Sequence, residues 1–172
     1  TEFRIGVIAD ARREMAAAAD QTEYERAGVL RDKSRAIERT MESQKMAAFA
    51  RTELDLFGMA RQDGQAATQL FAIRNGKLIG RDVYLVDATR EAPDEEVLGS
   101  FLGQYYARAS SVPREVYVPF LPPDAADIEA FLTEKRGSHV RLHVPQRGER
   151  RELMALAARN AGETLAREQA RW

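Results

Sequence analysis

Two stripes of apolar residues with a helical period run through the first fifty residues. They recur at three- and four-residue steps, first through Ile5, Ile8, Ala11, Met15 and Ala19, and then through Tyr24, Ala27, Leu30, Ile37 and Met41. This period predicts two amphipathic helices. Residues 20–22 interrupt the pattern, and Thr22 with Glu25 has the spacing of a capping box that begins the second helix. Residues 1–50 are therefore predicted to form an antiparallel helical hairpin.

The following residues change to the pattern of strands. Residues 54–60, 67–73 and 78–86 are predicted to be three consecutive antiparallel strands. Asn75-Gly76 lies between the second and third, and it is typical of a type I′ turn, in which both central residues have positive φ.

Helices and strands alternate after residue 90. We expect a helix opened by Pro93-Asp94, a strand over 116–118, a helix closed by Gly137, a strand over 140–144 and a long terminal helix through Leu153, Leu156, Ala157, Ala161 and Leu165. Helical crossovers imply parallel pairing of the later strands. The order βββαβαβα predicts an α+β or α/β domain of ribonuclease-H-like topology over residues 51–172, with a mixed five-stranded sheet.

A nuclease of this topology needs clustered carboxylates to hold metal ions. One acid belongs midway along the first strand, where this chain has Gly58, and another at the end of the fourth, where it has Val118-Pro119-Phe120. Asp55 and Asp63 are expected to flank the first strand, too far apart to share a metal. We therefore predict no catalytic and no metal site, and keep open the alternative of a metal-dependent nuclease whose acids lie in another register.

The formal net charge of −1 conceals an uneven distribution. Residues 1–50 carry nine positive and nine negative side chains, residues 51–134 carry eight and 14, and residues 135–172 carry nine and four. Such a polarised chain is not a uniformly basic nucleic-acid binder. It leaves room for one local basic surface near the C-terminal end.

That basic segment contains Lys135, Arg136, Arg147, Arg150 and Arg151. The residues surround a predicted strand end and helix start, where free backbone amides also attract anions. Sequence-independent contact with a DNA backbone is one interpretation. Pairing with acidic residues of the same domain is the other, and the pattern alone does not separate them.

Other candidate chemistry is sparse. His139 and His143 are predicted to lie on one side of a strand without a third metal ligand, and Gly76-Lys77 lacks the rest of a phosphate loop. No cofactor is therefore expected. The chain has no cysteine, which excludes disulfides and thiolate metal sites within it and fits a cytoplasmic setting. No apolar run is long enough to span a membrane.

The ends of the chain suggest a piece of a longer protein. It starts at Thr1 instead of Met, and it stops at Trp172 inside a charged helical pattern without a stop signal. The hairpin's own apolar stripe is thin and rich in alanine, and a unit of this size cannot bury enough surface to be stable alone. It is expected to pack on its own domain or to pair with another hairpin.

The second half of the hairpin resembles a known motif. Tyr24, Glu25, Ala27, Arg31 and Asp32 match the UVR motif of the bacterial excision-repair families UvrB and UvrC, while Gly28 and Ser34 depart from it. The resemblance implies docking onto the C-terminal UVR hairpin of UvrB. On that basis the expected partner-binding residues are Tyr24, Glu25, Ala27, Leu30 and Arg31, with Tyr24 as the aromatic anchor.

Residues 71–80, 101–106, 113–115 and 145–153 resemble the central region of the UvrC family. This region lies between the family's catalytic N-terminal and C-terminal domains, and the motifs of those domains are missing from this chain. The resemblance implies a non-catalytic part of an excision nuclease in nucleotide excision repair. It would bind UvrB and scaffold the nuclease domains.

Overall fold

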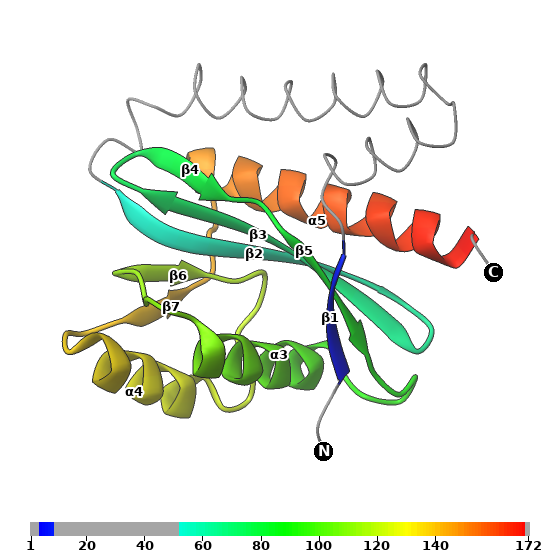
Figure 1. Cartoon of the computed structure of the whole chain (residues 1–172), viewed down its shortest axis with the longest axis horizontal. Coiled ribbons are helices and arrows are strands. Elements are labelled where there is room, and N and C mark those ends of the chain that lie inside the picture. The colour runs from blue at the N-terminus through cyan, green and yellow to red at the C-terminus, as the bar shows by residue number, and fades with distance from the viewer. Residues whose placement is uncertain (1–3, 9–51, 171–172) are drawn as a thin grey trace.

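The computed structural model of the chain describes residues 4–8 and 52–170. Seven strands form one sheet, with α5 across one face and α3 and α4 across the other (Figure 1). The elements are β1 (Arg4–Ile8), β2 (Glu53–Gln62), β3 (Gln65–Arg74), β4 (Lys77–Gly80), β5 (Val83–Asp87), α3 (Asp94–Arg108), β6 (Glu115–Tyr117), α4 (Ala125–Arg136), β7 (Arg141–His143) and α5 (Gly148–Ala170).

The strand order is β1-β5-β3-β2-β6-β7, with β4 also paired to β3. The pairs β1–β5, β5–β3 and β3–β2 are antiparallel, whereas β6 runs parallel to β2 and β7 runs parallel to β6. The helical crossovers produce this parallel pairing, as expected. The mixed sheet confirms the predicted ribonuclease-H-like class.

The sheet contains more strands than the five predicted. The expected strand over residues 78–86 is divided into β4 and β5, which pair with different parts of β3. The register shifts between Ala72 and Ile73 where β4 joins, so one straight strand cannot follow β3 along its whole length.

The other additional strand corrects the reading of the first residues. The three-residue spacing of Ile5 and Ile8 predicts a helix, but Arg4–Ile8 is a strand that pairs antiparallel with β5. A five-residue apolar segment fits either period, and the open edge of β5 decides between them. The remainder of the predicted hairpin, residues 9–50, lies outside the described residues.

Two predicted turns are confirmed by their backbone angles. Asn75 and Gly76 have φ of 52° and 74°, as a type I′ turn between β3 and β4 requires. Gly137 has φ of 86°, and its N–H donates to the carbonyl of Thr133, so it ends α4 in the left-handed conformation.

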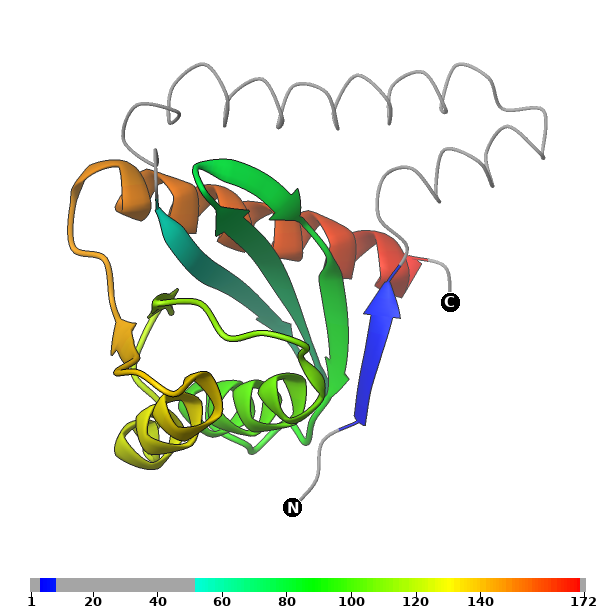
Figure 2. The same ribbon diagram turned by 60° about the vertical axis from the view of Figure 1, so that its left-hand side comes forward.

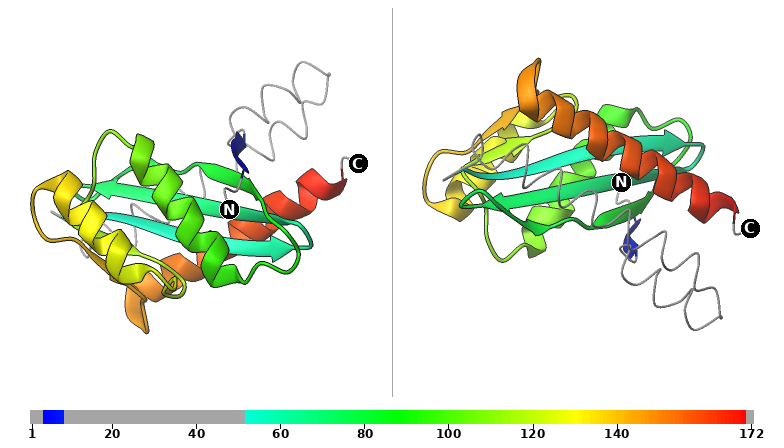
Figure 3. Two further views of the ribbon diagram at one scale, coloured as in Figure 1. Left: turned by 90° about the horizontal axis from the view of Figure 1, so that it is seen from below. Right: turned by 90° about the horizontal axis from the view of Figure 1, so that it is seen from above.

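The two faces of β2 bury different cores. Phe57 packs with Phe101 and Tyr106 of α3, while Leu54 and Leu56 pack beneath α5. Figure 3 shows α3 and α4 on one side of the sheet and α5 crossing the strands on the other. Among the described residues, no helix is long and apolar enough to cross a membrane.

Candidate interaction sites

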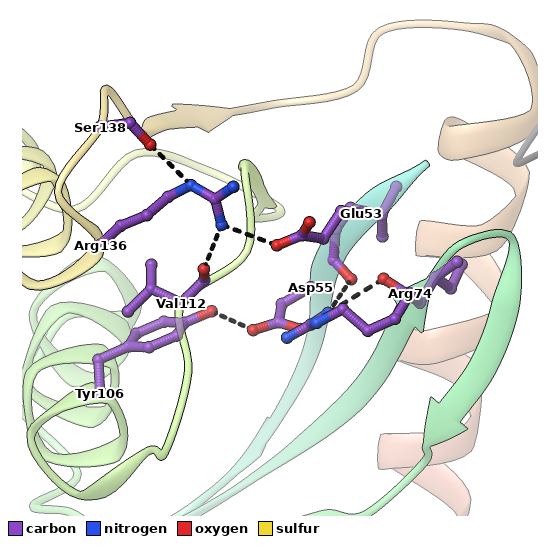
Figure 4. Close-up of polar contacts among 9 residues, drawn as sticks. Glu53, Asp55, Arg74, Tyr106, Val112, Arg136 and Ser138 are labelled. Atoms are coloured by element: carbon purple, nitrogen blue, oxygen red, sulfur yellow. Dashed lines mark hydrogen bonds and ion pairs between the residues drawn. The ribbon is translucent and has the colours of Figure 1, made fainter. Parts of the chain in front are cut away.

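A row of charged and polar side chains lies where β2 begins, on the face covered by α3 and α4 (Figure 4). Asp55 is 1% exposed, and its carboxylate is held from two sides. The Tyr106 hydroxyl donates to Oδ2 at 2.7 Å, and the Arg74 guanidinium pairs with Oδ1 at 2.9 Å. These contacts join β2 to α3 and to the end of β3.

A second ion pair continues the row. Arg136 Nη1 lies 2.7 Å from Glu53 Oε1 and also donates to the Val112 carbonyl at 2.6 Å, while its Nε donates to Ser138 Oγ. One arginine at the end of α4 thereby joins the start of β2 to the loop that precedes β6 (Figure 4).

Burial is the largest influence on the pKa of Asp55 and of Tyr106 in this row. Loss of hydration raises the pKa of Asp55 above its usual 3.8, although the Tyr106 hydrogen bond and the Arg74 charge act in the opposite direction. The pKa of the Tyr106 hydroxyl is raised well above its usual value, first by burial and then by the adjacent carboxylate. Tyr106 therefore stays protonated and remains a hydrogen-bond donor.

This geometry corrects the expected position of Asp55, which lies inside β2 and does not flank it. Its carboxylate is engaged with the Arg74 guanidinium and the Tyr106 hydroxyl. Among residues 4–8 and 52–170, no group of three His, Cys, Asp or Glu side chains is placed to hold a metal ion.

Gly58, at the predicted acid position, lies directly beneath α5. A Cβ atom at Gly58 would stand 2.5 Å from the Ala157 Cβ and 2.5 Å from the Ala158 backbone nitrogen. Because real Cβ contacts are never so short, the helix backbone occupies the space into which a carboxylate would project. The close approach explains why glycine stands in the middle of this strand.

The five predicted nucleic-acid-binding residues are divided between the two faces of the sheet (Figure 1). Lys135 and Arg136 are in the last turn of α4, on the α3 side. Arg136 forms the Glu53 pair described above, and Lys135 Nζ donates to the Tyr106 carbonyl. Both side chains are engaged inside the domain.

Arg147 directly precedes α5, and Arg150 and Arg151 lie in its first turn, on the opposite face of the sheet. Arg147 and Arg151 are exposed, whereas the Arg150 guanidinium carbon lies 5.3 Å from the centre of the Tyr117 ring. Lys135, Arg136 and Arg150 make contacts within the domain, so a surface that binds an anion would rely on Arg147 and Arg151.

Sequence reasoning missed the aromatic contact beside these arginines. The rings of Tyr117 and His143 stack at 5.0 Å between β6 and β7. The parallel register that places these two residues opposite each other depends on strands 26 positions apart, so local patterns carry no signal for it. His143 is the last residue of β7 and stacks on Tyr117, whereas His139 precedes the strand and so does not share its side, contrary to the prediction.

The predicted partner-binding residues Tyr24, Glu25, Ala27, Leu30 and Arg31 lie outside the described residues. The structure shows only where their segment is attached: it follows β1 and precedes β2.

Comparison with known proteins agrees with this architecture. The fold is that of a ribonuclease-H-like domain, and residues 53–168 match the family described as the UvrC ribonuclease H-like domain. Residues 6–40 match the UvrB/uvrC motif. The chain belongs to the UvrC family.

Curated relatives carry the same family name. UvrABC system protein C of Symbiobacterium thermophilum is 42% identical over 159 residues, 92% of this chain and 25% of the relative. The corresponding protein of Syntrophotalea carbinolica is 38% identical over 92% of the chain and 26% of the relative. The corresponding protein of Desulforudis audaxviator is 41% identical over 90% of this chain and 25% of the relative. The chain thus spans about a quarter of the length of these relatives.

Proposed function

We propose that this chain is the central region of a UvrC-type excision nuclease that acts in nucleotide excision repair in the cytoplasm. It binds the C-terminal UVR hairpin of UvrB through Tyr24, Glu25, Ala27, Leu30 and Arg31, and it holds the nuclease domains in place without cutting DNA. The match of residues 6–40 to the UvrB/uvrC motif carries the docking part of this proposal.

The position of Gly58 supports the non-catalytic part. The backbone of α5 fills the space where an acid of the first central strand would project. The nearest buried carboxylate, Asp55, is on the opposite face of β2 and is paired with Arg74. Both observations favour a scaffold over a metal-dependent nuclease.

Titration of the full chain with a peptide of the UvrB C-terminal UVR hairpin tests the docking proposal. Tyr24→Ala is expected to weaken binding by ten-fold or more, because aromatic anchors dominate small interfaces. Tyr24→Phe keeps the ring and serves as the matched control. Unchanged affinity in Tyr24→Ala would show that the anchor lies elsewhere, and no binding by the unmodified chain would reject docking itself.

A direct contact with DNA is the second candidate function. Arg147 and Arg151 are exposed at the start of α5, and this observation favours a small phosphate-binding surface there. Lys135 and Arg136 make contacts within the domain, so this candidate DNA-binding surface does not include them.

A further inference from the structure

β7 is the last strand on one side of the described sheet, next to β6. The unpaired N–H and C=O groups of such an edge strand are a template on which a strand of another chain can pair, so soluble proteins cover, charge or shorten their edge strands. β7 has three residues, and Figure 2 shows α4 (yellow) beside it (orange). The contacts between these two elements determine whether the edge is open.

The backbone groups of β7 point alternately toward β6 and away from it. The Val118 N–H donates to the His143 carbonyl at 2.8 Å, so the backbone groups of His143 face β6. Those of Arg141 face the same way, since the strand alternates. The N–H and C=O groups of Val140 and Leu142 therefore point to the outer side, where the next strand of a larger sheet would lie.

Side chains of α4 bind both of these outward N–H groups. Glu129 Oε2 accepts from the Leu142 N–H at 2.8 Å. The Thr133 hydroxyl oxygen accepts from the Val140 N–H at 3.0 Å, and the hydroxyl donates to the Val140 carbonyl at 3.4 Å. Glu129 and Thr133 are four residues apart and so are neighbours on one face of the helix. They occupy the positions at which the carbonyl groups of a neighbouring strand would accept.

The packing of α4 holds these two side chains in place. Ile128 and Leu132 are buried in the same core as Leu142. Each of them directly precedes one of the polar residues, so burial of the apolar face brings Glu129 and Thr133 to the rim of the sheet. Both polar residues are half-buried. The cover of the β7 edge is therefore part of the folded core and does not depend on a loose surface side chain.

We propose that Glu129 and Thr133 close the β7 edge and keep the ribonuclease-H-like domain from pairing there with a second copy of this chain. A two-fold axis at Leu142, the centre of β7, would pair two β7 strands antiparallel, with each Leu142 N–H donating to the Leu142 carbonyl of the other copy. The bond to Glu129 removes the donor that this pairing needs. The carboxylate also places a negative charge where the incoming carbonyl oxygen would lie.

Amide hydrogen exchange of the full chain, at a dilution where it is monomeric, tests whether the edge is closed. The Leu142 amide is expected to be protected although it belongs to an edge strand. In Glu129→Ala its exchange is expected to be about ten-fold faster, because a hydrogen bond to a charged group is lost. The His143 amide faces β6 and is the internal control. Free exchange of Leu142 in the unmodified chain would overturn the proposal.

Sedimentation velocity over a range of chain concentrations tests what the closed edge prevents. Glu129→Ala with Thr133→Ala uncovers both outward N–H groups and is expected to dimerise at lower concentration than the unmodified chain. Glu129→Gln with Thr133→Ser makes the same change of charge but keeps both acceptors, and it is the matched control. Thermal unfolding verifies that both variants are folded.

The position of the new contact completes the test. Dimerisation of the alanine variant, with protection of Leu142 regained at high concentration, supports the proposal. Equal association of the two double variants, or association without regained protection at Leu142, contradicts it. If the alanine variant does not fold, exchange at Leu142 in the unmodified chain and in Glu129→Gln decides: protection in both supports closure of the edge by these acceptors, and free exchange in both rejects it.

Discussion

A buried carboxylate between an arginine and a tyrosine is the strongest electrostatic feature at the scale of single residues. Burial raises the pKa of Asp55, and the Tyr106 hydrogen bond and the Arg74 charge offset part of that rise. The contribution of Asp55 to stability therefore depends on pH. Tyr106 is the partner that can be removed with the least change of shape, because phenylalanine fills the same volume.

The pH dependence follows from the raised pKa of Asp55. The folded state binds this proton more tightly than the unfolded state, whose pKa is near 3.8. The contribution of Asp55 is therefore complete below that pH and declines as pH rises through the folded value. The unfolding free energy of the unmodified chain minus that of Asp55→Asn is expected to fall from about pH 3 to about pH 7 in denaturant titrations. A constant difference would contradict the assignment.

Tyr106→Phe removes the hydrogen bond that lowers the pKa of Asp55. It is expected to reduce the unfolding free energy at neutral pH by about 1.5–3 kcal/mol, the usual contribution of a hydrogen bond to a charged group. The reduction should shrink in acid, where the carboxyl group is protonated. An equal loss at both pH values would indicate altered packing instead.

At the scale of elements, the close contact between α5 and β2 can be tested by a single substitution at Gly58. Gly58→Ala would place a Cβ against the helix backbone, which cannot yield as a side-chain end can. We expect a loss of about 1–3 kcal/mol in unfolding free energy, as for other overpacked sites. Chemical denaturation measures it.

Gly103→Ala is the control for that substitution. Gly103 is an exposed residue of α3, and a Cβ there would meet nothing within 4 Å. It should stabilise the chain by about 0.5–1 kcal/mol through helix propensity. A similar effect of the two substitutions would mean that α5 does not press on Gly58.

Local patterns predicted most of the elements and the sense in which the central strands pair, but not the contacts between distant residues. The Asn75-Gly76 turn and the glycine that ends α4 were predictable because their backbone angles depend on adjacent residues. β1 was not, because its state depends on β5, more than seventy residues away. The same limit applies to the candidate sites: contacts between distant residues decided that Arg136 faces Glu53 and that Arg150 covers Tyr117.

At the scale of the whole molecule, the charge distribution allows a direct test of DNA contact. Arg147→Ala with Arg151→Ala is expected to weaken binding of duplex DNA at low salt, and to reduce the slope of log affinity against log salt by about 1.8. Arg108→Ala with Arg114→Ala removes the same charge from exposed residues elsewhere and is the matched control. Equal losses would indicate only a general charge effect.

A cleavage assay tests the nuclease alternative. The same DNA, incubated with the chain and Mg²⁺ or Mn²⁺, should remain uncut, and cutting would restore that alternative.

Residues 9–51 connect a strand paired on one side, β1, to a strand paired on both sides, β2, and this difference has a mechanical consequence. A pull on residues 9–51 reaches β1 and β2 at the same end of the sheet, but the two strands resist it differently. β1 can peel from β5 one pair at a time, starting at Ile8 and Val83. β2 has neighbours on both sides and two ion pairs at its start, so it bears the remaining load. Under tension β1 therefore yields first, and the chain lengthens by a few residues while the ribonuclease-H-like core stays intact.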